Sequence, residues 1–551
     1  MSNTGDGAIG GPAPVAGFRR RSLVDSLGAV VAQTVRRPGH TAGSLSRLAG
    51  AAVDAARGRG ELARGSGDRR FADPAWTGNF LYRGLLGGYL AAESELAAWL
   101  AGRELSDVDR ERARFVLSSA LAALSPSNLP VNPAAIKQFI DTGGRSAVAG
   151  LRRLLGDVLH NGGFPSQVDV EKFSVGGNLA TTEGSVVFRN EVLELIQYAP
   201  NTATVRARPL VIAPPQINKY YLFDLSPDKS VVRYARDNGF HVFAVSWRNP
   251  TARQRDWDLA TYLVALEEAL EAACAITGSP DVNLAGACAG GVTSVALAAW
   301  LAARGKPLVN ALTLIVSVFD TSADKTLLSV FASGEMLAAA KRRSHVRGVF
   351  DGRELAMVFN LLRPDDLIWT YWVNNYLLGR RPPAFDVLYW NNDTTRLAAA
   401  FHGQLIDLYR DNPLAMPGGV VIDGTPLDLG DITADAFVVA GTTDHITPWE
   451  ACYHSARRLG GTVEFTLSST GHILSILNAP GNPKSAYRTN AEPAESTAEW
   501  EAGADTVAGS WWPRWMEWLD ERSGDLVAAP SAAGDDEHAP IEAAPGSYVR
   551  A

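Results

Sequence analysis

The residue with the clearest chemical signal is Cys288, which stands in the run Gly-Ala-Cys-Ala-Gly-Gly at 286–291. An apolar segment before it predicts a strand over 282–285, and an alanine-rich segment after it predicts a helix over 292–304. A G-x-nucleophile-x-G turn between a strand and a helix holds a catalytic side chain at a strained bend where only small neighbours fit. The helix N-terminus also favours a thiolate. We therefore predict that Cys288 is a nucleophile; the alternative is a buried, inert thiol.

An acid and a base follow in the chain order that such a turn requires, which is nucleophile, acid, histidine. Asp444 leaves the end of a strand predicted over 437–440, and His472 follows a strand predicted over 462–467. Each residue alone is a weak signal, since an Asp after a strand is often a helix cap. Together they predict a triad in which His472 takes the proton of Cys288 and Asp444 orients the imidazole and stabilises its charge.

Acyl transfer through such a triad also needs N–H groups that stabilise the oxyanion of the tetrahedral intermediate. The residue after the nucleophile, Ala289, is expected to supply one of them. The loop Pro-Pro-Gln-Ile-Asn at 214–218, which follows a predicted strand, is expected to supply the other. Because proline has no N–H, Gln216 or Ile217 is the expected donor.

Strands and helices alternate on both sides of these residues, which predicts an α/β class with a mostly parallel sheet covered on both faces. The alternation of strands and helices is interrupted by an aromatic-rich stretch over 321–417, which is a candidate cap or lid. Near the end, four tryptophans are spaced as in a helix docked on the core. They are Trp511, Trp512, Trp515 and Trp518.

The expected domain organisation follows from changes in composition and hydrophobic pattern along the chain. We expect a flexible leader over 1–66, a helical N-terminal domain over 67–175, a catalytic domain over 176–525 with the cap insert at about 321–417, and a loose tail over 526–551. We expect a frayed helix within the leader over 22–35. The helical domain lacks clustered histidines, cysteines or carboxylates, so we expect it to serve as scaffold or in dimer contacts.

Composition narrows the class of protein. The chain has 551 residues, of which 46% are hydrophobic and 20% charged, as in ordinary globular proteins. Its net charge of -8 argues against broad nucleic-acid binding. Three cysteines without C-x-x-C spacing predict neither disulfides nor structural zinc, and Cys274 and Cys452 are expected to be inert. We predict no metal and no cofactor, and no apolar run reaches the roughly 20 residues of a membrane span.

Several long blocks of this sequence resemble the polyhydroxyalkanoate synthases, most closely their single-subunit medium-chain class, class II. The resemblance extends from residue 68 to residue 515 and is carried by the following blocks: DRRF (68–71), PPQINKYYLFDLSPDKS (214–230), VSWRNPT (245–251), GACAGG (286–291), RPDDLIWTYWVNNYLLG (363–379), LYWNNDTTRL (388–397), DHITPWE (444–450), GHILSILN (471–478) and SWWPRW (510–515).

This resemblance implies an α/β-hydrolase fold and an acyltransferase that polymerises (R)-3-hydroxyacyl-CoA, releases CoA and carries the acyl group on Cys288. It implies that Asp444 also helps to activate the hydroxyl of the growing chain. It further implies a homodimer in the cytoplasm on the granule surface, with the nascent polyester and the granule-coat phasins as partners. The alternatives are an acyl-CoA thioesterase on the same triad and, from another class, a granule-bound scaffold with a vestigial triad.

Four further residues are candidates for substrate contacts: Asn218, His445, Lys484 and Arg488. Lys484 and Arg488 are cations near His472 that would bind the phosphates of CoA; the alternative is that they are solvated surface residues. His445 is also the rival base of the triad.

Three residues near the triad depart from the usual medium-chain pattern, which leaves the chain-length preference open. Ala289 replaces a usual Ser, Leu474 a common Gln and Ala479 a common Pro.

Overall fold

The computed structural model describes residues 68–102, 105, 107–322, 334–490 and 494–551, with isolated positions between 43 and 57. The expected leader, including the helix over 22–35, lies almost entirely outside the described residues. The chain divides into two compact units. The first comprises Met1–Val170 and Glu354–Phe385, and the second Glu171–Arg353 and Asp386–Ala551.

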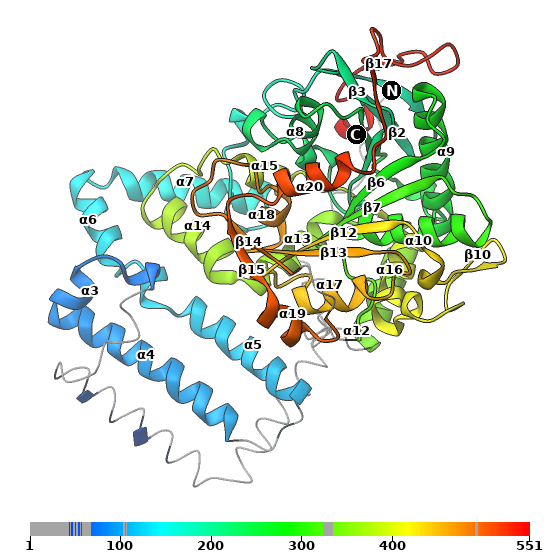
Figure 1. The fold of residues 1–551 in the computed structure, drawn as a ribbon. Helices are drawn as coiled ribbons and strands as arrows, with labels where there is room; N and C mark the ends of the chain where they lie inside the picture. The colour runs from blue at the N-terminus through cyan, green and yellow to red at the C-terminus, as the bar shows by residue number, and fades with distance from the viewer. Residues whose placement is uncertain are drawn as a thin grey trace. The chain divides into compact units, whose positions relative to one another are not determined.

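The first unit is helical, as we expected for the N-terminal domain. It contains α3 (Ala75–Gly78), α4 (Phe80–Ala101), α5 (Asp107–Ala123), α6 (Pro133–Asp141) and α7 (Arg145–His160), with η7 (Asp365–Trp369), α14 (Thr370–Trp372) and η8 (Val373–Leu377) (Figure 1). The side chain of Asn132 accepts a hydrogen bond from the Ala134 N–H at the start of α6, and Pro133 occupies the first helical position, where its missing N–H costs no hydrogen bond.

Residues 354–385 belong to this helical unit, although we expected them to form part of a cap on the sheet. Their aromatic side chains find partners among the helices. The hydroxyl of Tyr376 donates to Oδ2 of Asp157 at 2.6 Å, and Nε1 of Trp372 donates to the carbonyl of Asn128 at 3.1 Å. Gly150 of α7 lies against the carbonyl of Tyr376, where any side chain would clash.

The second unit contains an 11-stranded sheet with strand order β15-β14-β13-β12-β7-β6-β4-β5-β2-β1-β17. The six central strands are parallel, and the flanking strands on both sides are antiparallel. The flanking strands include β2 (Leu193–Tyr198), β14 (Ala486–Thr489) and β15 (Asp505–Ala508). The central strands are β5 (Val242–Trp247), β4 (Leu210–Ala213), β6 (Val282–Ala287), β7 (Val309–Ile315), β12 (Asp435–Gly441) and β13 (Val463–Ser468). The expected mostly parallel sheet is therefore confirmed.

Each face of the sheet packs on its own apolar cluster, because successive residues of a strand point to opposite sides. In β4, Val211 packs with residues of α9 (Leu259–Thr277) and α10 (Ala289–Ala303), whereas Ile212 packs with α8 (Val231–Asp237) and α20 (Trp512–Asp520). The four tryptophans of the last segment are buried in this second cluster, as expected for a docked helix. In Figure 1 these helices lie on both sides of the sheet.

The tail after residue 525 is not loose, which corrects our expectation. β16 (Leu526–Ala528) pairs with β3 (Thr204–Arg206), and β17 (Glu542–Ala543) pairs with β1 (Gly184–Arg189) at the sheet edge. The buried ammonium of Lys219 donates to the backbone oxygens of Val549 and Ala551 at 2.6 and 2.8 Å. These interactions use backbone groups, which leave no periodic side-chain signal in an Ala- and Pro-rich sequence.

One strand ends earlier than its apolar run suggested. The apolar run extends over 312–319, but β7 ends at Ile315, and Val316 has a positive φ of 45° that turns the chain. Among the described residues, no helix combines the length and apolar character needed to cross a bilayer.

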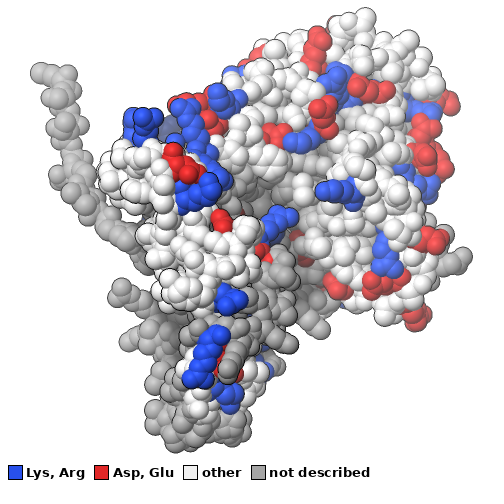
Figure 2. All heavy atoms as spheres, turned by 90° about the vertical axis from the view of Figure 1, so that its left-hand side faces the viewer, with Lys and Arg blue, Asp and Glu red and all other residues white. Residues whose placement is uncertain are grey.

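On the face that Figure 2 shows, acidic and basic side chains are mixed, with wide uncharged areas between them.

Candidate active site

Cys288 lies in the turn between β6 and α10, in a backbone conformation that a residue with a side chain rarely adopts. Its φ is 50° and its ψ is -123°. Its N–H donates to the carbonyl of Ile315 in the neighbouring strand β7 at 2.9 Å, and its carbonyl accepts from the Gly291 N–H at 3.0 Å. The thiol is half-buried and free. This is the strained turn predicted from the sequence, with the side chain at the carboxyl edge of the parallel strands.

The glycines of the turn are required by close contacts. A Cβ on Gly290 would press on the carbonyl groups of Ala213 and Pro214, and one on Gly291 would clash with the side chain of Ser317. The turn at Cys288 is therefore packed directly against the end of β4 and the loop that follows it. This contact joins the nucleophile to the loop predicted to supply an oxyanion donor.

His472 and Asp444 form a buried hydrogen-bonded pair, as predicted. Nδ1 of His472 lies 2.7 Å from Oδ2 of Asp444. Asp444 follows β12, and His472 begins the short helix α18 (His472–Ile476) after β13. Because Nδ1 is used by the carboxylate, Nε2 is the nitrogen left for the thiol of Cys288.

Thr447 completes the environment of the acid and was missed in the sequence. Its hydroxyl donates to Oδ2 of Asp444 at 2.7 Å and lies 3.0 Å from Nδ1 of His472. The N–H groups of Ile446 and Thr447 donate to Oδ1 of Asp444 at 2.8 and 3.0 Å. The only sequence signal was a Thr three residues after an Asp, a common side-chain-to-backbone turn that by itself does not indicate a catalytic role.

The electrostatics of the pair favour charged forms. Burial raises the pKa of Asp444, but the charge of His472 and the hydrogen bonds from His472 and Thr447 outweigh it, so that the pKa lies below its usual value. Burial lowers the pKa of His472, but the charges of Asp444 and Cys288 outweigh that effect and raise the pKa to about 10.

The expected oxyanion donors have N–H groups that are available for a ligand. Within the described part of the chain, neither Ala289, Gln216 nor Ile217 donates its backbone N–H to a protein acceptor. The 216–218 loop is held by the hydroxyl of Thr395, which donates to the Gln216 carbonyl at 2.7 Å. The side-chain amide of Gln216 donates to the hydroxyl of Thr293 in α10 at 3.0 Å. Which N–H stabilises the oxyanion stays a prediction.

The other candidate residues differ in their settings. Asn218 forms an isolated bridge with Thr394, while His445 and Lys484 are exposed. The guanidinium of Arg488, which we considered as a partner of the CoA phosphates, donates instead to the side chain and the carbonyl of Glu501.

The two remaining cysteines and two other histidines lie outside the triad. Cys452 is fully buried, which raises the pKa of its thiol, and burial raises the pKa of the half-buried Cys274 to about 11. His241 and His402 are buried beside Gln197 and Ser344. Among the described residues, no group of three His, Cys, Asp or Glu side chains could hold a metal ion.

The sequence matches two family models and is similar to several proteins of known function. The model described as "Poly-beta-hydroxybutyrate polymerase (PhaC) N-terminus" matches residues 67–235, and one for the alpha/beta hydrolase fold matches residues 221–479. The chain is 51% identical over 536 residues to Poly(3-hydroxyalkanoate) polymerase 1 of Ectopseudomonas oleovorans, covering 97% of this chain and 96% of that protein. It is 40% identical to the polymerase subunit PhaC of Cupriavidus necator, covering 90% and 85%.

The raised pKa of His472 predicts a pH-dependent contribution to stability. The unfolded value is about 6.5 and the folded value about 10, so the contribution is complete below pH 6.5 and is lost as the pH rises to 10. The difference in unfolding free energy between the wild type and His472→Gln should therefore shrink between pH 6.5 and 10. Urea denaturation at pH 6, 8 and 10 measures it; a difference that is constant across this range would contradict the ion pair.

The packing at the turn predicts that Gly290→Ala displaces the loop after β4. We expect the rate of CoA release to fall by roughly a hundredfold, the effect of losing one oxyanion donor, while the circular dichroism spectrum is retained. Gly88→Ala is the matched control, because a Cβ there meets nothing within 4 Å. Equal activity of the two variants would show that the close contact does not position the donor loop.

Proposed function

The chain belongs to the poly(3-hydroxyalkanoate) polymerases, and from this membership we propose that it polymerises 3-hydroxyacyl groups through an acyl-enzyme on Cys288. The observation that carries the proposed chemistry is the Cys288 turn together with the buried His472–Asp444 pair. The substrate is the (R)-3-hydroxyacyl-CoA thioester, and the products are polyester and CoA.

In the first step, the thiolate of Cys288 attacks the carbonyl carbon of the acyl-CoA thioester. The negative charge that develops on the carbonyl oxygen is stabilised by the N–H of Ala289 and by an N–H of the 216–217 segment. The bond from the carbonyl carbon to the sulfur of CoA then breaks. The leaving thiolate takes the proton that His472 holds, so CoA departs as a thiol and the acyl group stays on Cys288.

In the second step, the hydroxyl at the end of the growing chain attacks the acyl group on Cys288. His472 takes the hydroxyl proton, the new ester bond forms, and the bond to the cysteine sulfur breaks to restore the thiolate–imidazolium pair. Asp444 supports this step through His472, because both of its oxygens already accept hydrogen bonds from Ile446, Thr447 and His472. A thioester intermediate suits the transfer, since its conversion to an oxygen ester is favourable.

Three further properties are hypotheses that rest on the family resemblance. They are assembly as a homodimer, location in the cytoplasm on the surface of polyester granules, and binding of granule-coat proteins. The chain-length preference is also open, because Ala289 and Leu474 depart from the medium-chain pattern near the triad.

The test of the proposed function compares the wild type with Cys288→Ala in assays with 3-hydroxyoctanoyl-CoA and 3-hydroxybutyryl-CoA. We expect CoA release with insoluble polyester from the wild type and a loss of at least about a thousandfold in Cys288→Ala, since the nucleophile is removed. Cys274→Ala is the matched control and should retain full activity.

Three results would alter the proposal. Release of CoA with only free hydroxy acid as product would indicate a thioesterase. Activity that survives Cys288→Ala would contradict the mechanism. The substrate that gives the faster polymerisation would establish the chain-length preference.

A further inference from the structure

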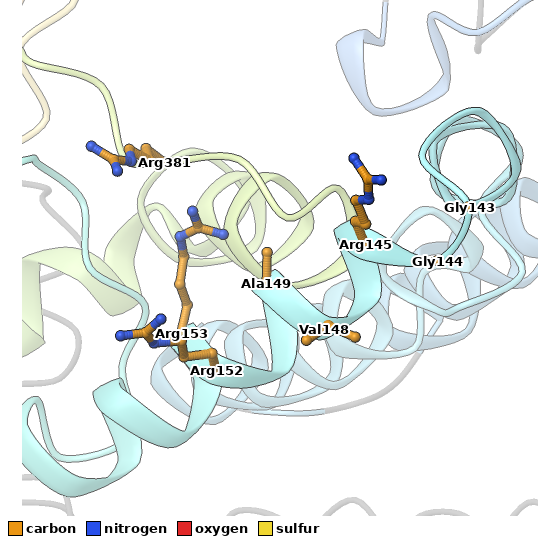
Figure 3. A pocket seen from close by; sticks show the side chains of 8 residues that line it. All are labelled: Gly143, Gly144, Arg145, Val148, Ala149, Arg152, Arg153 and Arg381. Atoms are coloured by element: carbon orange, nitrogen blue, oxygen red, sulfur yellow. The ribbon is translucent and has the colours of Figure 1, made fainter.

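A hollow of about 810 Å³ in the first unit is lined almost entirely by cations and small residues. Three arginines extend from α7, and a fourth comes from a separate segment of the same unit (Figure 3). The residues that line the hollow are Gly143, Gly144, Arg145, Val148, Ala149, Arg152, Arg153 and Arg381. None of them takes part in the chemistry at Cys288.

These four arginines have no acidic partners. Within the described residues, none of them forms a salt bridge, whereas elsewhere in the same unit Arg70 pairs with Asp68 and Asp365. Arg153 is fixed by donating to the carbonyl of Gly379 at 2.7 Å. Burial lowers the pKa of Arg153, and the charges of Arg381 and Arg152 lower it further. Like charges held this close are stabilised when an anion enters between them.

Large apolar side chains are exposed beside this hollow. On α7, Val148, Leu151, Leu155 and Leu159 recur every three or four residues, and each is at least 54% exposed. On the adjoining α6, Ile136, Phe139 and Ile140 are also exposed, and the Phe139 ring lies against Gly144. The two helices therefore expose large apolar side chains next to the arginines of the hollow.

The positive charge of this surface indicates what kind of partner can bind it. A second copy of the chain, docked face to face, would bring two arginine clusters together at a cost in repulsion. The leader is an equally poor fit, because residues 1–66 contain nine arginines but only four acidic residues. An apolar helix surface combined with arginines is the pattern of helices that lie in the plane of an anionic lipid surface, with the apolar side chains in the acyl region and the cations at phosphate groups.

We propose that α6 and α7 dock the protein on an anionic lipid surface, where the arginine-lined hollow binds lipid phosphate groups and the exposed apolar side chains enter the lipid. This site is independent of the proposed function, because it uses none of the triad residues.

The test is flotation of the full chain with vesicles of phosphatidylcholine alone or mixed with phosphatidylglycerol. We expect the wild type to bind the anionic vesicles and to bind phosphatidylcholine far more weakly. The double variant Arg152→Gln/Arg381→Gln should bind the anionic vesicles roughly thirtyfold more weakly, from the loss of two charges near the surface. Arg152→Lys/Arg381→Lys should retain most of the binding.

A matched pair of charge changes separates the hollow from net charge. Arg233→Gln/Arg363→Gln removes two exposed arginines that pair with Asp237 and Asp366, and it should bind like the wild type. Leu155→Ser/Leu159→Ser should also weaken vesicle binding at least tenfold, and CoA release by this variant reports that the catalytic unit is intact.

Several outcomes would overturn the proposal. They are equal binding to both kinds of vesicle, equal weakening by the two charge pairs, and unchanged binding of the leucine variant. Binding of inorganic phosphate or of an acidic protein, without binding to anionic vesicles, would also overturn it and would assign the hollow to a soluble anion or a protein partner.

Discussion

The structure around the active site depends on one tight contact, the meeting of the Cys288 turn with the loop after β4. The turn holds Cys288 at a φ of 50°, and glycine at 290 brings α10 against the carbonyl groups of Ala213 and Pro214. This contact places the thiol at the carboxyl edge of the parallel strands. It also fixes the loop whose N–H groups are proposed to face the oxyanion. A side chain at position 290 would separate the two parts of the site, and the fully buried strands β4 and β6 keep them in register.

The acid and base are organised by the neighbouring half of the sheet. β12 and β13 are adjacent and parallel, with Gly441 opposite Ser468, so the residues that follow them leave the same edge. Asp444 and His472 meet there in a buried site, where each hydrogen bond is stronger than in water and an unpaired charge would be costly. Thr447 and two N–H groups satisfy the carboxylate, so the pair can remain charged in its buried site.

Much of this site could be predicted from the sequence because its signals are local. The glycine run marks the turn at Cys288, and buried parallel strands appear as apolar runs that end at Asp444 and before His472. Other features depend on contacts with no local pattern. The tail pairs through its backbone and the carbonyls held by Lys219, and residues 354–385 pack with the helical unit through aromatic contacts. Thr447 follows a common turn pattern, and only the folded geometry gives it a role.

The central claim is that the growing acyl group is carried on Cys288. It is tested most directly by mixing the enzyme with 3-hydroxyacyl-CoA, quenching in acid within the first turnover, and locating the added mass among the peptides. We expect a 3-hydroxyacyl group on the peptide that contains Cys288, with none on the peptides of Cys274 and Cys452. Polyester formation with an acyl group on another residue, or with no covalent adduct at any time, would contradict it.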